Sequence, residues 1–168
     1  DYDDTFEIEK GTIQCYTERF DNGDYLAFFR SPFNSKNNLT YLHNVYHENM
    51  KKYFNFGKYI IAVNMIGTDF QDRNNGSDQD SDSGYATNQA DIVEHARKCY
   101  IKYPTIVNNI PKDSNKYDNT MDDYAKIDNN LAGSQRDIGE SSNIAQIAQT
   151  YACNFKDQKY IDYVCSKR

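Results

Sequence analysis

An acidic stretch at residues 76–84 sets the strongest limit on the fold, because it joins three aspartates through small or polar residues. Asp78, Asp80 and Asp82 stand at positions i, i+2 and i+4. On a strand this spacing places all three carboxylates on one face, and in a tight loop it lets them point toward one ion. Neighbouring negative charges repel, so the stretch must be solvated or neutralised by a cation. Mg²⁺ and Ca²⁺ prefer such oxygen ligands.

Composition indicates one domain of 168 residues, with or without a helical appendage. Only 38% of residues are hydrophobic and none is Trp, so 15 Tyr and 9 Phe must supply much of the core. The formal charge of −6 argues against a protein that coats nucleic acid. No apolar run is long enough for a membrane span. The chain begins without Met, and we expect it to be part of a longer protein.

The four cysteines are widely spaced and include no C-x-x-C pair. Neither a zinc ribbon nor a dense disulfide framework fits this spacing. We therefore expect reduced thiols and a cytoplasmic location. The four are Cys15, Cys99, Cys153 and Cys165.

The N-terminal third is predicted to be β structure. Residues 12–17 alternate in polarity, residues 21–24 give a turn signal, and residues 25–29 are again apolar. This pattern predicts a hairpin that ends before Pro32. Residues 58–67 are the most apolar stretch and are rich in β-branched side chains, which predicts a buried strand.

Residues 34–57 show roughly helical apolar spacing and contain His43 and His47 at i,i+4. Such a pair can bind zinc from one helix face. The pattern is not His-Glu-x-x-His and has no evident third ligand nearby, which favours structural or solvated histidines.

The C-terminal half is predicted to be helical. A helix should run from Asn88 until it stops before Pro104. After a polar excursion over 104–125, further helices are expected at 127–138, 142–151 and 156–165. We therefore divide the chain into a β-rich core with the acidic loop and following helix, 1–103, and a helical extension, 104–168.

A calcium loop is one interpretation of the aspartates. An EF-hand starting at Asp78 needs Gly at its sixth position and Glu at its twelfth. Ser83 and Gln89 occupy those positions, so the EF-hand pattern fails. A solvated loop is another interpretation, because Asp, Ser, Asn and Gly runs are common in loops.

A catalytic magnesium site is the third interpretation, and here a resemblance to a known family arises. The run from Asp78 to Asp82 is similar to the D-x-D-G-D metal loop of the large catalytic subunit of cellular RNA polymerases and their single-chain relatives. In that family the three aspartates hold the Mg²⁺ that polarises the primer 3′-hydroxyl and contacts the phosphates of the incoming nucleotide. Arg30-Ser31-Pro32 matches the family's upstream Arg-x-Pro motif, whose arginine approaches the substrate ribose.

The order of further features also resembles the family over residues 25–140. A short strand at 84–87 and a helix follow the loop, and residues 133–139 loosely match the family's Ser-Gln-Asp segment. Ser81 replaces the family's Gly, and Gly76-Ser77 stands where the family has Asn before the loop. The second barrel, which supplies paired lysines in that family, is not in this chain.

The sequence thus predicts an α+β fold, with a small β-barrel over residues 5–87 followed by helices. The resemblance implies that the barrel is of the double-psi type, that Asp78, Asp80 and Asp82 are catalytic ligands of Mg²⁺, and that Arg30 binds the nucleotide. It implies nucleotides and nucleic acid as partners of the full-length protein, and no activity for this chain alone. The alternative is a non-catalytic module that binds Ca²⁺ or a partner protein. Asp69 and Asp72 are candidates for residues that hydrogen-bond to the metal ligands or that bind a second metal ion.

Overall fold

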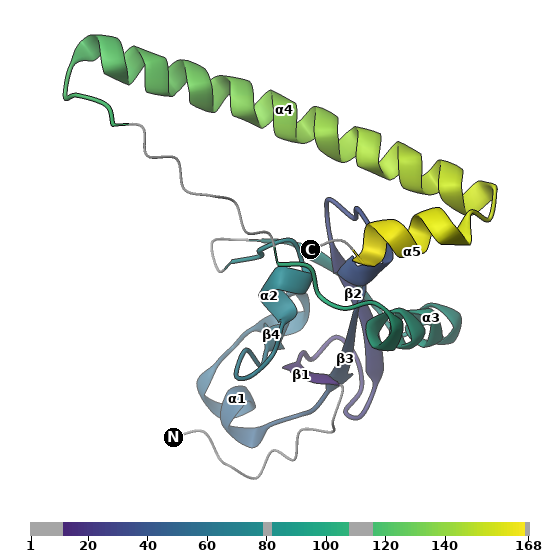
Figure 1. The fold of residues 1–168 in the computed structure, drawn as a ribbon. Coiled ribbons are helices and arrows are strands. Elements are labelled where there is room, and N and C mark those ends of the chain that lie inside the picture. The colour runs from purple at the N-terminus through teal and green to yellow at the C-terminus, as the bar shows by residue number, and fades with distance from the viewer. Residues whose placement is uncertain (1–11, 79–81, 108–115, 167–168) are drawn as a thin grey trace.

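The computed structural model describes residues 12–78, 82–107 and 116–166, which form an α+β fold (Figure 1). Its five-stranded sheet is curled into a half-barrel, and the C-terminal part is helical, which confirms the α+β class. The strands are β1 (Ile13–Tyr16), β2 (Tyr25–Arg30), β3 (Thr40–Asn44), β4 (Ala62–Val63) and β5 (Gly84–Thr87).

The sheet has the strand order β4-β1-β3-β2-β5. β1 is parallel to β3, and the other neighbours are antiparallel. The predicted hairpin of β1 and β2 is therefore wrong, because β3 lies between them. Residues 21–24 do form a turn, but its hydrogen bonds are to the end of β3. Gly23 donates its backbone N–H to the Asn44 carbonyl at 2.8 Å, and the Asn44 N–H donates to the Asp24 carbonyl at 2.8 Å.

The roughly helical spacing over residues 34–57 corresponds to a helix only in part. A 3-10 turn, η1 (Lys36–Asn38), precedes β3, and only α1 (Glu48–Tyr53) is helical. β3 has neighbours on both sides, and four of its five residues are buried. Sheet pairing therefore outweighs the local helical spacing of the aromatic residues.

The buried strand predicted over 58–67 is mostly absent. The chain forms a second 3-10 turn, η2 (Gly57–Tyr59), and the two-residue β4. Tyr59 is 91% exposed and Ile66 is 58% exposed. β4 lies at the edge of the described sheet and pairs only with β1, so it is short, as edge strands often are.

Besides α1, the described residues form four α-helices. α2 (Phe70–Arg73) is a single turn, and α3 (Ala90–Lys102) confirms the helix predicted before Pro104, although its N-cap is Gln89. α4 (Met121–Asn154) replaces two predicted helices, because the backbone stays helical through Gly139. α5 (Gln158–Ser166) agrees closely with the last predicted helix.

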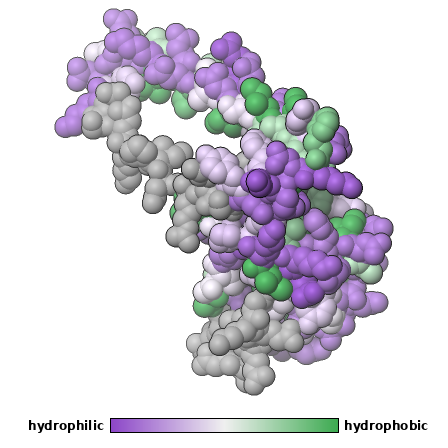
Figure 2. Space-filling view, turned by 45° about the vertical axis from the view of Figure 1, so that its right-hand side comes forward, coloured by the Kyte–Doolittle hydropathy of each residue, from purple (hydrophilic) through white to green (hydrophobic). Residues whose placement is uncertain are grey.

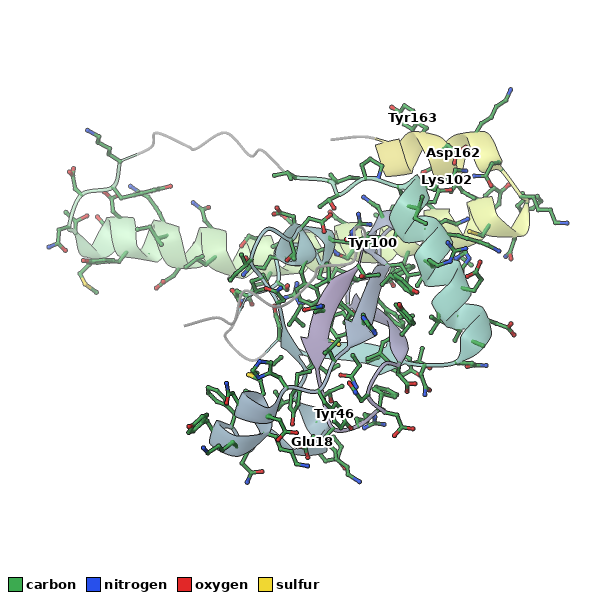
Figure 3. The ribbon with its side chains drawn as sticks, turned by 90° about the horizontal axis from the view of Figure 1, so that it is seen from below. Glu18, Tyr46, Tyr100, Lys102, Asp162 and Tyr163 are labelled. Atoms are coloured by element: carbon green, nitrogen blue, oxygen red, sulfur yellow. The ribbon has the colours of Figure 1, made fainter. Side chains whose placement is uncertain are left out.

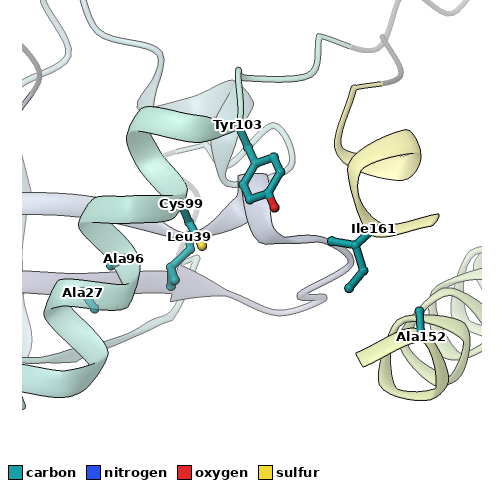
Figure 4. Close-up of a cluster of buried hydrophobic side chains, with 7 residues drawn as sticks. All are labelled: Ala27, Leu39, Ala96, Cys99, Tyr103, Ala152 and Ile161. Atoms are coloured by element: carbon teal, nitrogen blue, oxygen red, sulfur yellow. The ribbon is translucent and has the colours of Figure 1, made fainter. Parts of the chain in front are cut away.

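Two hydrophobic clusters hold these elements together. One contains Ile13, Cys15, Leu26, Leu42 and Phe70. The other joins the sheet and α3 to the ends of α4 and α5, so it crosses the boundary between 1–103 and 104–168 (Figure 4). Its members are Ala27, Leu39, Ala96, Cys99, Tyr103, Ala152 and Ile161.

Asp162 fastens α5 to the end of α3 (Figure 3). Its carboxylate accepts from Lys102 Nζ at 3.1 Å and from the Tyr103 hydroxyl at 3.1 Å. Much of α4 projects beyond the sheet, and Figure 2 shows apolar residues on the exposed face of the helical part. None of the helices described is long and apolar enough to cross a membrane.

Among the cysteines described with their side chains, Cys15, Cys99 and Cys153, none forms a disulfide bond. Burial raises the pKa of the Cys15 thiol to about 12, so this side chain stays neutral and behaves as a small apolar group in the core. Cys153 is exposed, on the surface of α4.

Gly84 allows β5 to approach β2 closely, and we expect Gly84→Ala to destabilise the protein. A Cβ at this position would lie 2.0 Å from Phe28 Cζ, where no side chain can remain without a shift. Overpacking of this kind costs about 1–3 kcal/mol of unfolding free energy. Urea denaturation would measure this cost, with Gly139→Ala as the control: nothing lies within 4 Å of a Cβ there, and alanine in the middle of α4 should raise stability by up to about 1 kcal/mol. An unchanged urea midpoint for Gly84→Ala would contradict the prediction.

Candidate functional site

The structure brings Arg30 and Asp82 together although 52 positions separate them in the chain. Arg30 Nη2 lies 2.7 Å from Asp82 Oδ1, and both side chains are about three-quarters buried, with 24% and 22% of their surface exposed. The pairing of β2 with β5 explains this contact. Arg30 is opposite Gly84 in the ladder, so the two residues before β5 fall beside the arginine.

The acidic loop is closed by a hydrogen bond between its ends. The backbone N–H of Asp78 donates to Asp82 Oδ2 at 3.0 Å. This bond holds the exposed Asp78 next to the ion-paired Asp82. Asp80, the third predicted ligand, lies outside the described residues, as does Ser81.

A third segment completes the surroundings of Arg30. Its Nη1 donates to the backbone carbonyls of Asn74 and Asn75, at 3.3 and 3.4 Å. The guanidinium thus lies between the turn that follows α2 and the end of the acidic loop. This arrangement fixes one positive charge next to the aspartates.

Asp82 keeps acceptor capacity beyond its described contacts. Each oxygen of Asp82 already accepts one hydrogen bond, and a carboxylate oxygen has a second lone pair for a metal. Three carboxylates and one guanidinium carry two net negative charges, which a divalent cation would balance. Among the residues that the structure describes, no three His, Cys, Asp or Glu side chains are grouped closely enough to hold a metal.

A hollow of about 760 Å³ adjoins the loop at Ser83 and Gly84. Three aromatic rings line one side: Phe29 lies 5.6 Å from Phe33 and 5.2 Å from Tyr85 between ring centroids. Tyr85 is 57% exposed, so much of its ring is open to a ligand.

The other described lining residues of the hollow are mostly polar and include no carboxylate. Lys36 and His95 supply the basic groups. Burial, with added repulsion from Lys36 and Lys98, lowers the pKa of His95, so the imidazole is neutral at pH 7. α4 contributes five further polar side chains, Gln146, Gln149, Thr150, Cys153 and Asn154. Lys36 is thus the one charged side chain among the described lining residues.

The other polar residues singled out in the sequence have structural partners. Asp69 Oδ2 pairs with Arg73 Nη2 at 3.2 Å, and the Thr105 hydroxyl also donates to it. Asp72 is exposed in the first turn of α2. These contacts give no support to a role for either aspartate at the acidic loop.

His43 and His47 lie on different elements rather than on one helix face. His43 is on β3, and its ring stacks on Tyr25 with centroids 4.5 Å apart. His47 caps α1, and its Nδ1 accepts the Asn49 backbone N–H at 3.2 Å. Both histidines therefore have structural contacts, as the sequence pattern favoured.

The asparagines around Arg30 and the lining of the hollow were missed in the sequence. Asn75-Gly76 carried a signal, because Asn-Gly is typical of tight turns with positive φ, and both residues have it, at 58° and 66°. The α4 residues carried none, since a polar helix face gives no indication of what it contacts. No protein-family model, curated protein or solved structure matches this chain significantly. Its function has to be inferred from the geometry of this site.

Proposed function

We propose that this chain carries the Mg²⁺-binding catalytic loop of an RNA-polymerase-like nucleotidyltransferase. The observation that carries the proposal is the 2.7 Å contact of Arg30 with Asp82. The Arg-x-Pro and D-x-D-x-D motifs are far apart in the sequence, yet a polymerase site needs them side by side. The antiparallel pairing of β2 with β5 supports the proposal, because it brings the two motifs together.

The aspartates would act as metal ligands. Asp78, Asp80 and Asp82 present hard oxygen donors, and the bond from the Asp78 N–H orients the carboxylate of Asp82. When bound in such a site, Mg²⁺ lowers the pKa of an attacking hydroxyl and neutralises phosphate charge. The protein's part is to hold the three carboxylates in place before the substrate arrives.

Arg30 would hold the substrate from the other side of the loop. Its guanidinium donates to Asp82 and to two backbone carbonyls, which fixes its position before binding. A fixed cation next to the metal ligands can orient the sugar or a phosphate oxygen without reorganising.

The adjoining hollow has room for the organic part of a nucleotide. Its volume of about 760 Å³ falls in the usual range for small-molecule sites. The exposed ring of Tyr85 offers a stacking surface for a base, and Lys36 offers a charge for phosphate. The position of Ser83 and Gly84 in the lining joins this hollow to the end of the acidic loop.

The half-barrel suits a double-psi barrel completed by further strands. The described sheet contains both parallel and antiparallel neighbours and is curled, as a small barrel requires. α4 and its C-cap Phe155 also expose large apolar side chains on one face, with Ile144, Ile147 and Tyr151 in the helix. Exposed apolar faces of this kind mark interaction surfaces, and the proposed partner is the lysine-bearing second barrel.

Metal binding tests the proposal on the chain itself. We expect Mn²⁺, used as a paramagnetic substitute for Mg²⁺, to bind one site, and Mg²⁺ to compete with it. Asp82→Asn should weaken binding by roughly tenfold or more, because it removes a ligand charge. Asp128→Ala is the control, since Asp128 is an exposed aspartate on α4. Electron paramagnetic resonance of free Mn²⁺ gives the dissociation constants.

The competing class, a calcium or protein-binding module, predicts a different result. In that case Ca²⁺, and not Mg²⁺, raises the melting temperature, because a ligand stabilises only the fold that binds it. The acidic loop is followed by β5 rather than by the exiting helix of an EF-hand, which favours the magnesium proposal. Equal Mn²⁺ affinities of the wild type and Asp82→Asn would also reject the magnesium site.

A further inference from the structure

Asn75 lies in the turn between α2 and the acidic loop, where this turn contacts Arg30 and Pro32. Its backbone has φ of 58°, in the left-handed region that few residues other than glycine adopt readily. Asparagine is one of the residues that tolerates this conformation. The left-handed turn sets the direction of the carbonyl groups of Asn74 and Asn75, both of which accept from Arg30 Nη1.

The side chain of Asn75 fastens this turn to the chain just after Arg30. Asn75 Nδ2 donates to the Pro32 carbonyl at 2.7 Å, two residues beyond the arginine. Asn75 Oδ1 accepts from Asn38 Nδ2 at 3.0 Å. Asn75 therefore contacts Arg30 through its backbone carbonyl. Through its side chain it contacts Pro32, just beyond the end of β2.

Asn38 orients the side-chain amide of Asn75. It is 6% exposed, and its Nδ2 also donates to the Arg73 carbonyl at 2.8 Å. Its Oδ1 accepts from the backbone N–H groups of Asn34 and Ser35, at 3.3 and 3.1 Å. Because both ends of this buried amide are bonded, its direction is fixed, and that of Asn75 with it.

We propose that Asn75, oriented by Asn38, is a positioning residue that keeps Arg30 from closing on both oxygens of Asp82. The guanidinium now gives Nη1 to the two carbonyls and only Nη2 to Asp82 Oδ1. Released from the carbonyls, it would turn to the bidentate geometry that arginine prefers with carboxylates. Both oxygens of Asp82 would then be held by Arg30, and the carboxylate would bind a cation less well. The inference rests on the proposed function, because it concerns the same metal site.

A double-mutant cycle on the whole chain tests this role through Mn²⁺ affinity. Asn75→Gly keeps the positive φ and removes both side-chain bonds, and we expect it to weaken Mn²⁺ binding roughly fivefold. In an Arg30→Met background, Asn75→Gly should change the affinity no further. A merely structural role would give the same loss in both backgrounds, which would overturn the inference. Asn88→Ala, which removes an exposed amide contact elsewhere, is the control.

A metal-free measurement separates this inference from the proposed function. Nitrogen-15 NMR of the Arg30 guanidinium should give different Nη1 chemical shifts in the wild type and in Asn75→Gly, because Nη1 exchanges two carbonyl acceptors for a carboxylate oxygen. Identical signals in both proteins would overturn the positioning role. If the wild type binds no Mn²⁺, the proposed function fails, while the guanidinium signals still decide whether Asn75 positions Arg30.

Discussion

Asn44→Ala is expected to destabilise the protein by about 3–5 kcal/mol, because it leaves several buried polar groups unpaired. Asn44 ends β3 and is fully buried. Its Nδ2 donates to the carbonyls of Thr17, Phe20 and Asp21 at 3.0–3.1 Å. Its Oδ1 accepts the Thr17 backbone N–H at 3.0 Å. A domain of this size is stable by only about 5–15 kcal/mol, so the loss is a large fraction.

Urea denaturation of the whole chain would measure this loss. The midpoint should fall while the m-value stays constant, which indicates a change in stability rather than in compactness. Asn22→Ala is the matched control, because the Asn22 side chain accepts one exposed bond, from the Tyr46 N–H at 2.8 Å. Asn44→Ala unfolding within about 1 kcal/mol of the wild type would show that the carbonyls find other partners.

Asn44 also shows why part of the fold could not be predicted from the sequence. This chain is rich in asparagine, so no single asparagine stands out as buried. The role of Asn44 exists only once the loop at residues 17–21 folds onto the end of β3. The same limit applies to Asn38 and Asn75, whose contacts join segments 37 positions apart.

Local patterns predicted the elements that depend on local interactions. The spacing of apolar residues and the position of Pro104 located α3 correctly. They did not reveal β3, whose residues have roughly helical spacing. β3 is stabilised by β1 and β2 on either side, which a window of neighbouring residues cannot show. They also divided α4 at Gly139, where the helix in fact continues.

The spacing of the three aspartates predicted an ion site, and the resemblance to a known family added a catalytic role. Arg30 gained interest only beside the three aspartates. The antiparallel register of β2 with β5 is what brings the two together in space, and the strand pairing was not predicted. The hollow beside them needs α3, α4 and the sheet at once, so it could be found only in three dimensions.

Asp80→Ala is expected to abolish Mg²⁺-dependent synthesis in a protein that joins this chain to the lysine-bearing barrel. Asp80 is the central aspartate of the proposed loop, between the two ends tied by the Asp78 N–H and the Asp82 carboxylate. Loss of one of three metal ligands should lower the rate of nucleotide addition by about 10³-fold, equivalent to about 4 kcal/mol of activation free energy. The fold should survive, because neither described hydrophobic cluster draws a residue from the acidic stretch.

Primer extension with labelled nucleotides over a range of Mg²⁺ concentrations would measure the effect. Asp128→Ala should extend primers like the wild type, and circular dichroism should show that both variants keep the same helix content. If Asp80→Ala keeps the wild-type rate at saturating Mg²⁺, the aspartate is not a catalytic ligand. If the wild type itself synthesises nothing with the second barrel present, then the loop, with Ser81 in place of glycine, is not an active polymerase site.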